Sequence, residues 1–214
     1  MKLAQGGKTW ILTLFLASVI FLFFTILLTG SLRSILLFIT IILSSMTLLL
    51  LVFFRDPQRE ISSGIVASAD GIIREISTIQ DPDCGECKRV STFMNLHNVH
   101  VNRSPIQGTV VSVTHIPGSH LPAFTKESER NERVITILQT PENHRLKIVQ
   151  IAGTLARRIV PYIKQGDQLK AGDKIGLIRL GSRVDVYLPK NYKITCTNKQ
   201  RIKAGEDIIA LSHA

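Results

Sequence analysis

Residues Ile163–Ile178 read IKQGDQLKAGDKIGLI, and this stretch indicates the kind of fold that the chain adopts. A Gly-Asp pair occurs at 166–167 and again at 172–173. Glycine permits the positive φ that tight turns require, and aspartate accepts hydrogen bonds from nearby backbone N–H groups. Two such turns so close together leave room only for short strands. The stretch therefore predicts consecutive hairpin turns.

The sequence on either side continues this pattern of short strands. After Pro57, runs rich in Val, Ile and Thr recur between Gly, Pro and Asn residues. Strands at this spacing, with marked turns, predict a mostly β protein built as an antiparallel β sandwich or barrel. A short helix is expected only over Thr154–Ile163. The predicted strands are Ile72–Ile79, Arg89–Phe93, Thr109–His115, Val134–Gln139, Leu146–Ile151, Ile175–Ile178, Val184–Leu188 and Ile208–Leu211.

The glycine-containing hairpins at 163–178 resemble those of biotinyl/lipoyl-like barrels. Carrier domains of that kind present a lysine at a hairpin tip, within Met-Lys-Met or Asp-Lys-Ala. This chain has neither pattern. The resemblance therefore concerns the architecture and does not identify a carrier.

Two uncharged runs of 20 residues, Trp10–Thr29 and Ile35–Phe54, precede the β-rich part. About 20 apolar residues suffice for one helix to cross the bilayer core. Gly30–Ser34 between them is short and turn-like, so we predict an N-terminal two-helix transmembrane hairpin. The hydroxyl residues within the runs can bond to the helix backbone; they are Ser18, Thr25, Thr40, Ser44, Ser45 and Thr47.

Two other interpretations of these runs are weaker. A signal peptide has a shorter apolar region and a small-residue cleavage site, and no second span would follow it. A helix pair inside a soluble core would need more covering surface than residues 61–214 provide. We therefore expect residues 1–60 to form a membrane hairpin and residues 61–214 to form a catalytic β domain.

Basic residues predict the orientation of the hairpin. Lys2 and Lys8 lie on the same side as Arg55 and Arg59, whereas the connection carries only Arg33. The positive-inside rule then places both ends of the hairpin, and everything after it, in the cytoplasm. The expected location is the cell membrane, with the β domain on its cytoplasmic side.

The charge of the chain excludes some classes of partner. The formal net charge is +10, of which residues 1–60 carry +3 and residues 61–214 carry +7. The chain has one Trp, three Tyr and no Lys/Arg run that approaches a nucleic-acid footprint, so no nucleic-acid partner is expected. An anionic membrane surface fits the charge better. Three cysteines in 214 residues are too few for a disulfide framework.

Cys84 and Cys87 form a CxxC motif in a polar stretch that we interpret as a loop. Such a pair can be redox-active or can supply half of a zinc site. A structural zinc site needs four ligands, and the sequence offers no second CxxC or HxxxH to complete it. We favour a solvated loop with incidental thiols, and no metal site is expected.

The densest polar cluster is Asn95–Pro105, which contains His97 and His100. Val99 and Val101 favour a strand, in which residues three apart point to opposite faces. A local turn at Asn98 would instead bring the two histidines together. The alternatives are a metal or catalytic pair and two strand-end histidines bonded to the backbone.

Gly181-Ser182 lies at the start of a predicted strand. Most Gly-Ser pairs at such positions are simple turns. Glycine has no Cβ, however, so the following serine hydroxyl can approach the preceding carbonyl group.

Five separated motifs in this chain resemble the short form of the phosphatidylserine decarboxylase proenzyme family, including its archaeal relatives that act on archaetidylserine. The resemblance covers residues 53 to about 211. One departure from the long bacterial forms is Asn95-Leu96, where those forms carry an acidic-aromatic pair. The motifs are Phe53–Pro57 with Ala69–Gly71, His97–Pro105, Gln150–Gly153, Ala156–Val160 and Gly181–Pro189.

The resemblance implies self-cleavage between Gly181 and Ser182. It implies that Ser182 is the attacking residue, that His100 takes its proton and that Asp70 orients His100. The products would be a β chain of residues 1–181 and an α chain of residues 182–214, which begins with a pyruvoyl group made from Ser182. That covalent cofactor acts as the electron sink of the decarboxylation. His97 matches the histidine used in the decarboxylation step.

The implied reaction converts the serine headgroup of a phospholipid to ethanolamine with release of CO2. The main alternative is a membrane-anchored biotinyl/lipoyl-like carrier or adaptor without catalysis, and a weaker one is a metalloprotein that uses His97, His100 and the cysteines. The expected partners are the serine phospholipid, the membrane and the chain's own two fragments. The sequence leaves open the lipid tails, either acyl esters or isoprenoid ethers, and the oligomeric state, a homo-oligomer included.

Overall fold

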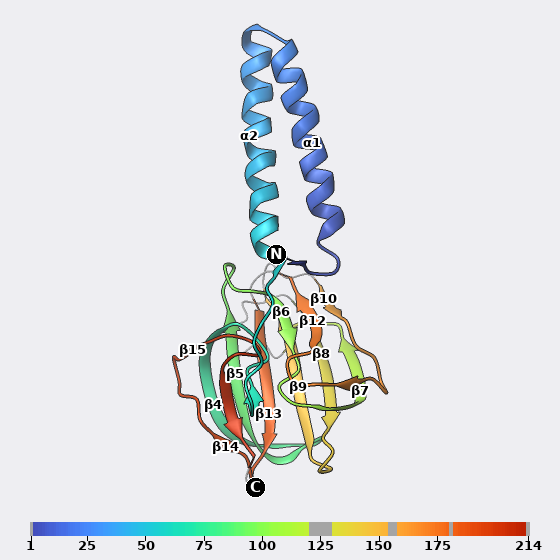
Figure 1. Ribbon diagram of the computed structural model, residues 1–214, viewed down its shortest axis with the longest axis vertical. Coiled ribbons are helices and arrows are strands. Elements are labelled where there is room, and N and C mark those ends of the chain that lie inside the picture. The colour runs from blue at the N-terminus through green and yellow to red at the C-terminus, as the bar shows by residue number, and fades with distance from the viewer. Residues whose placement is uncertain (1, 120–129, 154–157, 180–181, 213–214) are drawn as a thin grey trace. The chain divides into compact units, whose positions relative to one another are not determined.

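The computed structural model describes residues 2–119, 130–153, 158–179 and 182–212 (Figure 1). The chain divides into two compact units, Met1–Gln58 and Arg59–Ala214. The elements are β1 (Lys2–Leu3), α1 (Lys8–Leu27), α2 (Gly30–Phe53), β2 (Arg55–Asp56), β3 (Ile65–Val66), β4 (Gly71–Asp81), β5 (Gly85–Met94), β6 (Val101–Arg103), β7 (Gly108–Ile116), β8 (Arg133–Gln139), β9 (Arg145–Ala152), β10 (Ile159–Pro161), β11 (Gln168–Leu169), β12 (Lys174–Ile178), β13 (Ser182–Pro189), β14 (Lys193–Ile194), β15 (Arg201–Ile202) and β16 (Ile208–Leu211).

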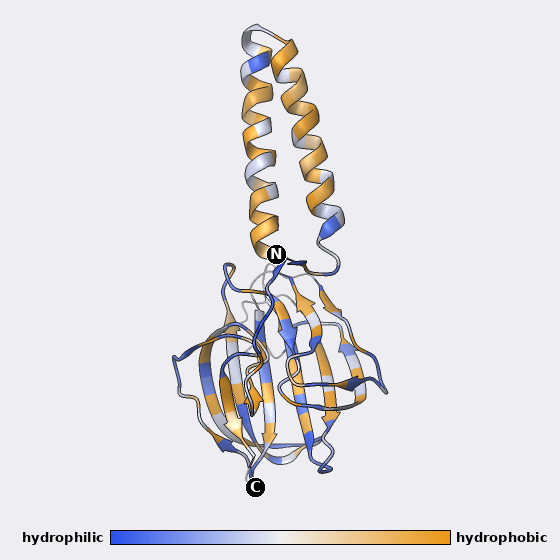
Figure 2. Ribbon diagram, in the orientation of Figure 1, coloured by the Kyte–Doolittle hydropathy of each residue, from blue (hydrophilic) through white to orange (hydrophobic). Residues whose placement is uncertain are grey.

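The first unit consists mainly of two apolar helices, as Figure 2 shows by colour. Both helices are long and apolar enough to cross a membrane, and most of their large side chains are exposed, unlike those of a soluble core helix. The turn between the helices is tighter than predicted. Only Leu28 and Thr29 separate them, because the positive φ of Gly30 reverses the chain and residues 30–34 already belong to α2.

Four of the six hydroxyl residues named in the sequence analysis donate hydrogen bonds to the backbone of their own helix, as predicted. Each donates to a backbone carbonyl three or four residues earlier at 2.7–2.9 Å, and all four are buried. They follow a seven-residue spacing within each helix, which is typical of small polar residues at a helix–helix contact. They are Ser18, Thr25, Thr40 and Thr47.

The second unit is built around one curled antiparallel sheet of eight strands, in the order β11-β7-β8-β9-β13-β5-β4-β15. Two three-stranded sheets, β10-β12-β6 and β14-β16-β3, accompany it. The predicted mostly β, antiparallel architecture is confirmed, and each of the eight predicted strands overlaps an observed one. The short helix expected over Thr154–Ile163 is wrong where it can be checked, because β10 pairs with β12; residues 154–157 lie outside the described residues.

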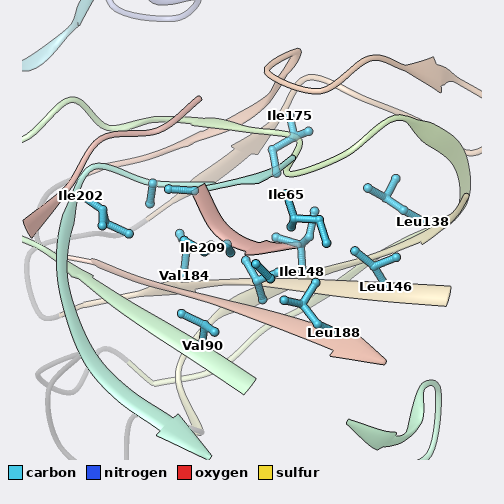
Figure 3. Close-up of a cluster of buried hydrophobic side chains, with 14 of the residues drawn as sticks. Ile65, Val90, Leu138, Leu146, Ile148, Ile175, Val184, Leu188, Ile202 and Ile209 are labelled. Carbon is cyan, nitrogen blue, oxygen red and sulfur yellow. The ribbon is translucent and has the colours of Figure 1, made fainter. Parts of the chain in front are cut away.

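The core lies between the large sheet and the two small sheets. Figure 3 shows that its apolar side chains come from all three, and burying each large aliphatic side chain contributes roughly 1.5–3 kcal/mol. On β13 the even-numbered residues face this core. The labelled members are Ile65, Val90, Leu138, Leu146, Ile148, Ile175, Val184, Leu188, Ile202 and Ile209.

Turns are present at Gly166 and Gly172, but they are not the consecutive hairpin turns that we predicted, because β11 pairs with β7 whereas β10 and β12 pair with each other. Both glycines have positive φ, +89° and +82°. Asp167 accepts the N–H of Lys164 at 2.9 Å, and Asp173 accepts that of Lys170 at 2.7 Å. Each carboxylate therefore accepts the N–H of the residue three positions before it. In an Asx-turn the carboxylate would instead accept the N–H of the residue two positions after it.

Candidate active site

Ser182 is the first residue of β13 and is completely buried. It pairs with Met94 of β5 on one side and with Ala152 of β9 on the other. As an even-numbered residue of β13, Ser182 lies on the core face of the large sheet, like Val184. The hydroxyl donates a hydrogen bond to the Sδ atom of Met94 at 3.3 Å. A serine in the middle of a sheet is thus held away from bulk water, beside a thioether. Gly181, the other half of the predicted cleavage site, lies outside the described residues.

His100 directly precedes β6 and is also completely buried. Its Nδ1 atom lies 2.8 Å from the carbonyl oxygen of Asn98. A carbonyl oxygen can only accept, so this contact places a hydrogen on Nδ1 and leaves the lone pair of the neutral ring on Nε2. That is the form that a general base requires. The carbonyl group of His100 accepts the N–H of Ile178 on β12 at 3.4 Å, which joins it to the small sheet β10-β12-β6.

A chain of buried polar side chains connects this small sheet to the large one. Gln150 of β9 donates to Asn102 Oδ1 at 2.7 Å, and Asn102 Nδ2 points to Met94 Sδ at 3.6 Å. His100 and Asn102 are two residues apart in extended chain and so share a face of β6. Asn102 therefore lies on the face of the small sheet that is turned toward Met94, and the two-residue period of extended chain predicts the same face for His100.

Glycine at position 176 makes room for this connection. A Cβ atom there would lie 3.0 and 3.2 Å from the two amide atoms of Gln150 and 2.9 Å from the carbonyl oxygen of Val160. We did not predict roles for Met94, Asn102, Gln150 or Gly176. The isolated polar residues Asn102 and Gln150 within apolar strands were the available signal.

Asp70 lies immediately before β4 and is buried, but the carboxylate is held by partners that the sequence did not indicate. Asp70 Oδ2 pairs with Arg59 Nη2 at 2.8 Å, and Oδ1 accepts the N–H of Ala204 at 2.8 Å. Arg59 also pairs with Glu206 at 2.8 Å. The described hydrogen bonds of Asp70 are these two, so its contact with His100 remains a prediction.

The Arg59 ion pairs shift the titration of two of these groups. Burial opposes the charge of Arg59, but its hydrogen bonds and charge interactions with Glu206 and Asp70 outweigh burial and raise its pKa. The hydrogen bond from Arg59 lowers the pKa of Glu206. Arg59, which we used only as a flanking charge, is thus a buried partner of a candidate site residue.

His97 lies in the turn between β5 and β6 and is exposed, in contrast to His100. The turn is closed by the N–H of Asn98 to the carbonyl of Asn95 at 3.0 Å and by the N–H of Asn95 to Asn98 Oδ1 at 2.8 Å. The local turn at Asn98 is therefore present. It leaves the two histidines in different environments, one at the surface and one in the interior.

A histidine–carboxylate pair, His115 with Glu132, occurs at the end of the sheet where Ser182 lies. Glu132 accepts Ala152 N–H through its backbone, which places it in the row of Ala152 and Ser182, about 10 Å from Ser182 at the usual strand spacing. Its buried Oε1 atom lies 2.9 Å from Nε2 of the exposed His115 and 3.3 Å from the N–H of Ile159. The sequence analysis did not single out this pair.

The CxxC pair is only partly in a loop. Residues 82–84 form the turn of the β4–β5 hairpin, whereas Cys87 is a buried residue of β5. Burial raises the pKa of Cys84 to about 12 and also raises that of Cys87, so both thiols stay protonated at neutral pH. Among the residues that the structure describes, no three His, Cys, Asp or Glu side chains cluster as metal ligands would.

The described residues thus include a completely buried serine and a completely buried histidine with a lone pair on Nε2, which are the two groups that an activated serine requires. The comparisons with known proteins identify the class further. The model of the phosphatidylserine decarboxylase family matches residues 46–210, which include every candidate site residue. The chain belongs to this family.

Curated relatives carry the same name or that of the archaeal branch. The phosphatidylserine decarboxylase proenzyme of Streptomyces avermitilis is 51% identical over 154 residues, which are 72% of this chain and 69% of the relative. The putative archaetidylserine decarboxylase proenzyme of Methanococcoides burtonii is 42% identical over 211 residues, 97% of this chain and 95% of the relative. That of Methanosarcina barkeri is 39% identical over 211 residues, 97% and 98% of the two chains.

Proposed function

We propose that this chain is a self-processing, pyruvoyl-dependent decarboxylase that converts the serine headgroup of a phospholipid to ethanolamine and CO2. The observation that carries the proposal is the placement of Ser182, completely buried at the start of a central strand, within a chain that belongs to a family of decarboxylase proenzymes. Cleavage would occur between Gly181 and Ser182.

The processing step assigns one role to each of three residues. His100 Nε2 takes the proton of Ser182, and the hydroxyl oxygen attacks the carbonyl carbon of Gly181, so that an ester replaces the peptide bond and the freed nitrogen takes a proton. Asp70 would stabilise the protonated imidazole, as the carboxylate of a triad does. Elimination releases the β chain with a Gly181 carboxylate that keeps the former serine oxygen. Tautomerisation and hydrolysis at position 182 then release ammonia and leave a ketone.

Position 182 suits the pyruvoyl group for which the family resemblance argues. Ser182 is shielded from water, and its hydroxyl contacts the thioether of Met94. A thioether is a weak hydrogen-bond acceptor, so little is lost when the hydroxyl disappears on conversion to the pyruvoyl group. When formed, the pyruvoyl group supplies a carbonyl that withdraws the electrons left on the substrate as CO2 departs. His97, at the surface of the same end of the sheet, would return a proton to the substrate carbon.

The α chain would stay in place after cleavage. Its first strand, β13, lies between β5 and β9, both of which belong to the β chain, and pairs with β5 from Ser182 to Pro189. Of its remaining strands, β15 pairs with β4, β16 pairs with β3, and β14 pairs with β16. Because the backbone hydrogen bonds of a central strand are buried on both sides, the 33-residue fragment has no route out that does not unfold the sheet.

The membrane is the second partner in the proposal. The two apolar helices would form a hairpin in the cell membrane with the catalytic unit on the cytoplasmic side, where the basic flanks favour it. A reporter fused after Ala214 should be active in the cytoplasm, and one inserted after Thr29 should be active outside. Activity of the first fusion outside the cytoplasm contradicts the orientation.

The processing proposal is tested by Ser182→Ala. The wild-type chain should yield fragments of 181 and 33 residues, and the variant should remain a single 23.8 kDa chain without decarboxylase activity. Ser91→Ala is the matched control, since Ser91 is a buried serine of the neighbouring strand β5 and should not affect cleavage. Mass spectrometry of the small fragment should show a pyruvoyl group at its N-terminus. Cleavage of Ser182→Ala at the wild-type rate contradicts the proposal, and a carrier or adaptor would remain intact in every variant.

A further inference from the structure

The thioether of Met94 is the meeting point of two buried donors. Ser182 Oγ lies 3.3 Å and Asn102 Nδ2 lies 3.6 Å from its Sδ atom. Gln150 fixes the orientation of the Asn102 amide through a bond of 2.7 Å to Oδ1, which turns the NH2 group toward the sulfur. All four residues are at most 1% exposed. Bulk water therefore does not reach these side chains.

A thioether is an unusual partner for a completely buried hydroxyl, because sulfur is a weak hydrogen-bond acceptor. Buried hydroxyls are normally paired with a carbonyl, carboxylate or amide oxygen. An acceptor of that strength would hold the serine proton firmly. In contrast, the Met94 thioether accepts the hydroxyl weakly, so little free energy is lost when the serine proton is released.

Conversion of Ser182 makes the choice of a weak acceptor more significant. The former hydroxyl oxygen leaves as part of the Gly181 carboxylate, and the Cβ atom of residue 182 becomes a methyl group. A strong acceptor at position 94 would then face a methyl group without a partner, which is costly in a buried site. A thioether loses little, because methionine packs well against apolar groups.

We propose that Met94 leaves Ser182 free to react: its thioether accepts the hydroxyl only weakly in the precursor, releases it for attack, and packs against the methyl group in the processed enzyme. Asn102 of the small sheet β10-β12-β6 contacts the sulfur, and Gln150 of β9 in the large sheet orients the Asn102 amide. The proposal rests on the proposed function, since it assigns the sulfur a role in self-cleavage at Ser182.

The strength of the acceptor at position 94 is the variable that the test must change. Met94→Leu keeps the volume and removes the acceptor, a swap that cores tolerate. Met94→Gln introduces a strong acceptor of similar length. Leu188→Gln is the matched control, because Leu188 is completely buried on the same strand and face as Ser182 but six residues away. Norleucine incorporation offers a further shape-conserving arm, since Met94 is one of only three methionines in the sequence.

The full chain is produced by cell-free translation in the presence of lipid nanodiscs. Translation is then stopped, and the rate of self-cleavage is measured as the loss of the 214-residue precursor on denaturing gels. Cleavage in Met94→Leu and in the norleucine chain should proceed at the wild-type rate or up to about threefold faster. Cleavage in Met94→Gln should be about tenfold slower, the effect of one typical net hydrogen bond that must first be broken. Leu188→Gln that folds should cleave at the wild-type rate.

Three results would overturn the proposal. Met94→Gln that cleaves as fast as Met94→Leu shows that acceptor strength does not matter. A tenfold lower cleavage rate in the Met94→Leu and norleucine chains shows that the sulfur does more than accept the hydroxyl weakly. This second test remains informative even if Met94→Gln does not fold. If the wild-type chain itself stays intact, the proposed function fails and the role of Met94 fails with it.

Discussion

The buried ion pair between Arg59 and Asp70 should be costly to break. Both side chains are buried, 7% and 9% exposed, and their charged atoms are 2.8 Å apart. Removing one partner of a buried pair costs about 3–5 kcal/mol, because the other charge is left in a poorly solvated place. Arg59→Gln creates this situation for Asp70, which retains only its bond from Ala204 N–H.

Glu206→Gln separates this effect from the second ion pair of Arg59. Glu206 is 33% exposed, so its pair is worth about 1 kcal/mol or less. For a unit of this size, 1 kcal/mol corresponds to roughly 2–4 °C in Tm. Arg59→Gln should therefore lower Tm by about 6–20 °C, and Glu206→Gln by at most about 4 °C.

The assay is thermal unfolding of the full chain in detergent, in the Ser182→Ala background so that cleavage does not alter the sample. The β-sheet signal of circular dichroism is the appropriate probe, because the single tryptophan, Trp10, lies in α1 and reports on the other unit. Arg59→Lys should recover part of the loss, since it restores the charge without the two-pronged geometry. The reasoning is refuted if Arg59→Gln loses no more than Glu206→Gln.

Three further predictions concern single groups. His97→Ala should still cleave into both chains but should lose about 10²–10⁴-fold in turnover, the usual contribution of a positioned acid or base. Near-normal turnover of the processed variant would exclude that role. The comparison is His100→Ala, which should not cleave. Cys84, with its pKa raised to about 12, should react with iodoacetamide at pH 8 on the order of 10³-fold more slowly than a free thiol, and rapid labelling of the native chain would contradict its burial. Because the pKa of Glu206 is lowered from 4.5, its contribution to stability is fully present above that value and is lost as pH falls through the lower pKa of the folded state. The Tm difference caused by Glu206→Gln should therefore shrink as the pH falls below 4.5.

The elements of the fold could be predicted from the sequence because their signals are local. Uninterrupted apolar runs predicted both helices, and alternation with turn residues predicted eight strands. Where local signals conflicted with the tertiary context, the prediction failed. Residues 159–161 form a strand because Ile159 and Val160 pair with β12, and Gly30 shortens the connection between the helices because its positive φ completes the turn by itself.

The candidate site was only partly accessible in this way. Ser182, His100 and Asp70 came from matching motifs, and their burial was not evident from the residues around them. The turn that separates His97 from His100 depended on Asn98, and the sequence allowed both outcomes.

What the sequence determined by itself was the class of architecture, because backbone preference and periodicity belong to local stretches of residues. The candidate site residues came from motifs that resemble those of a family. What only the tertiary structure decided was the partners of those groups: Met94 for Ser182, Asn102 and Gln150 for Met94, and Arg59 for Asp70. Arg59 stands 11 positions before Asp70 and 147 before Glu206, yet it contacts both. Such pairings depend on how the strands are arranged in space, because that arrangement decides which polar groups are buried next to one another. Buried polar groups are normally hydrogen-bonded.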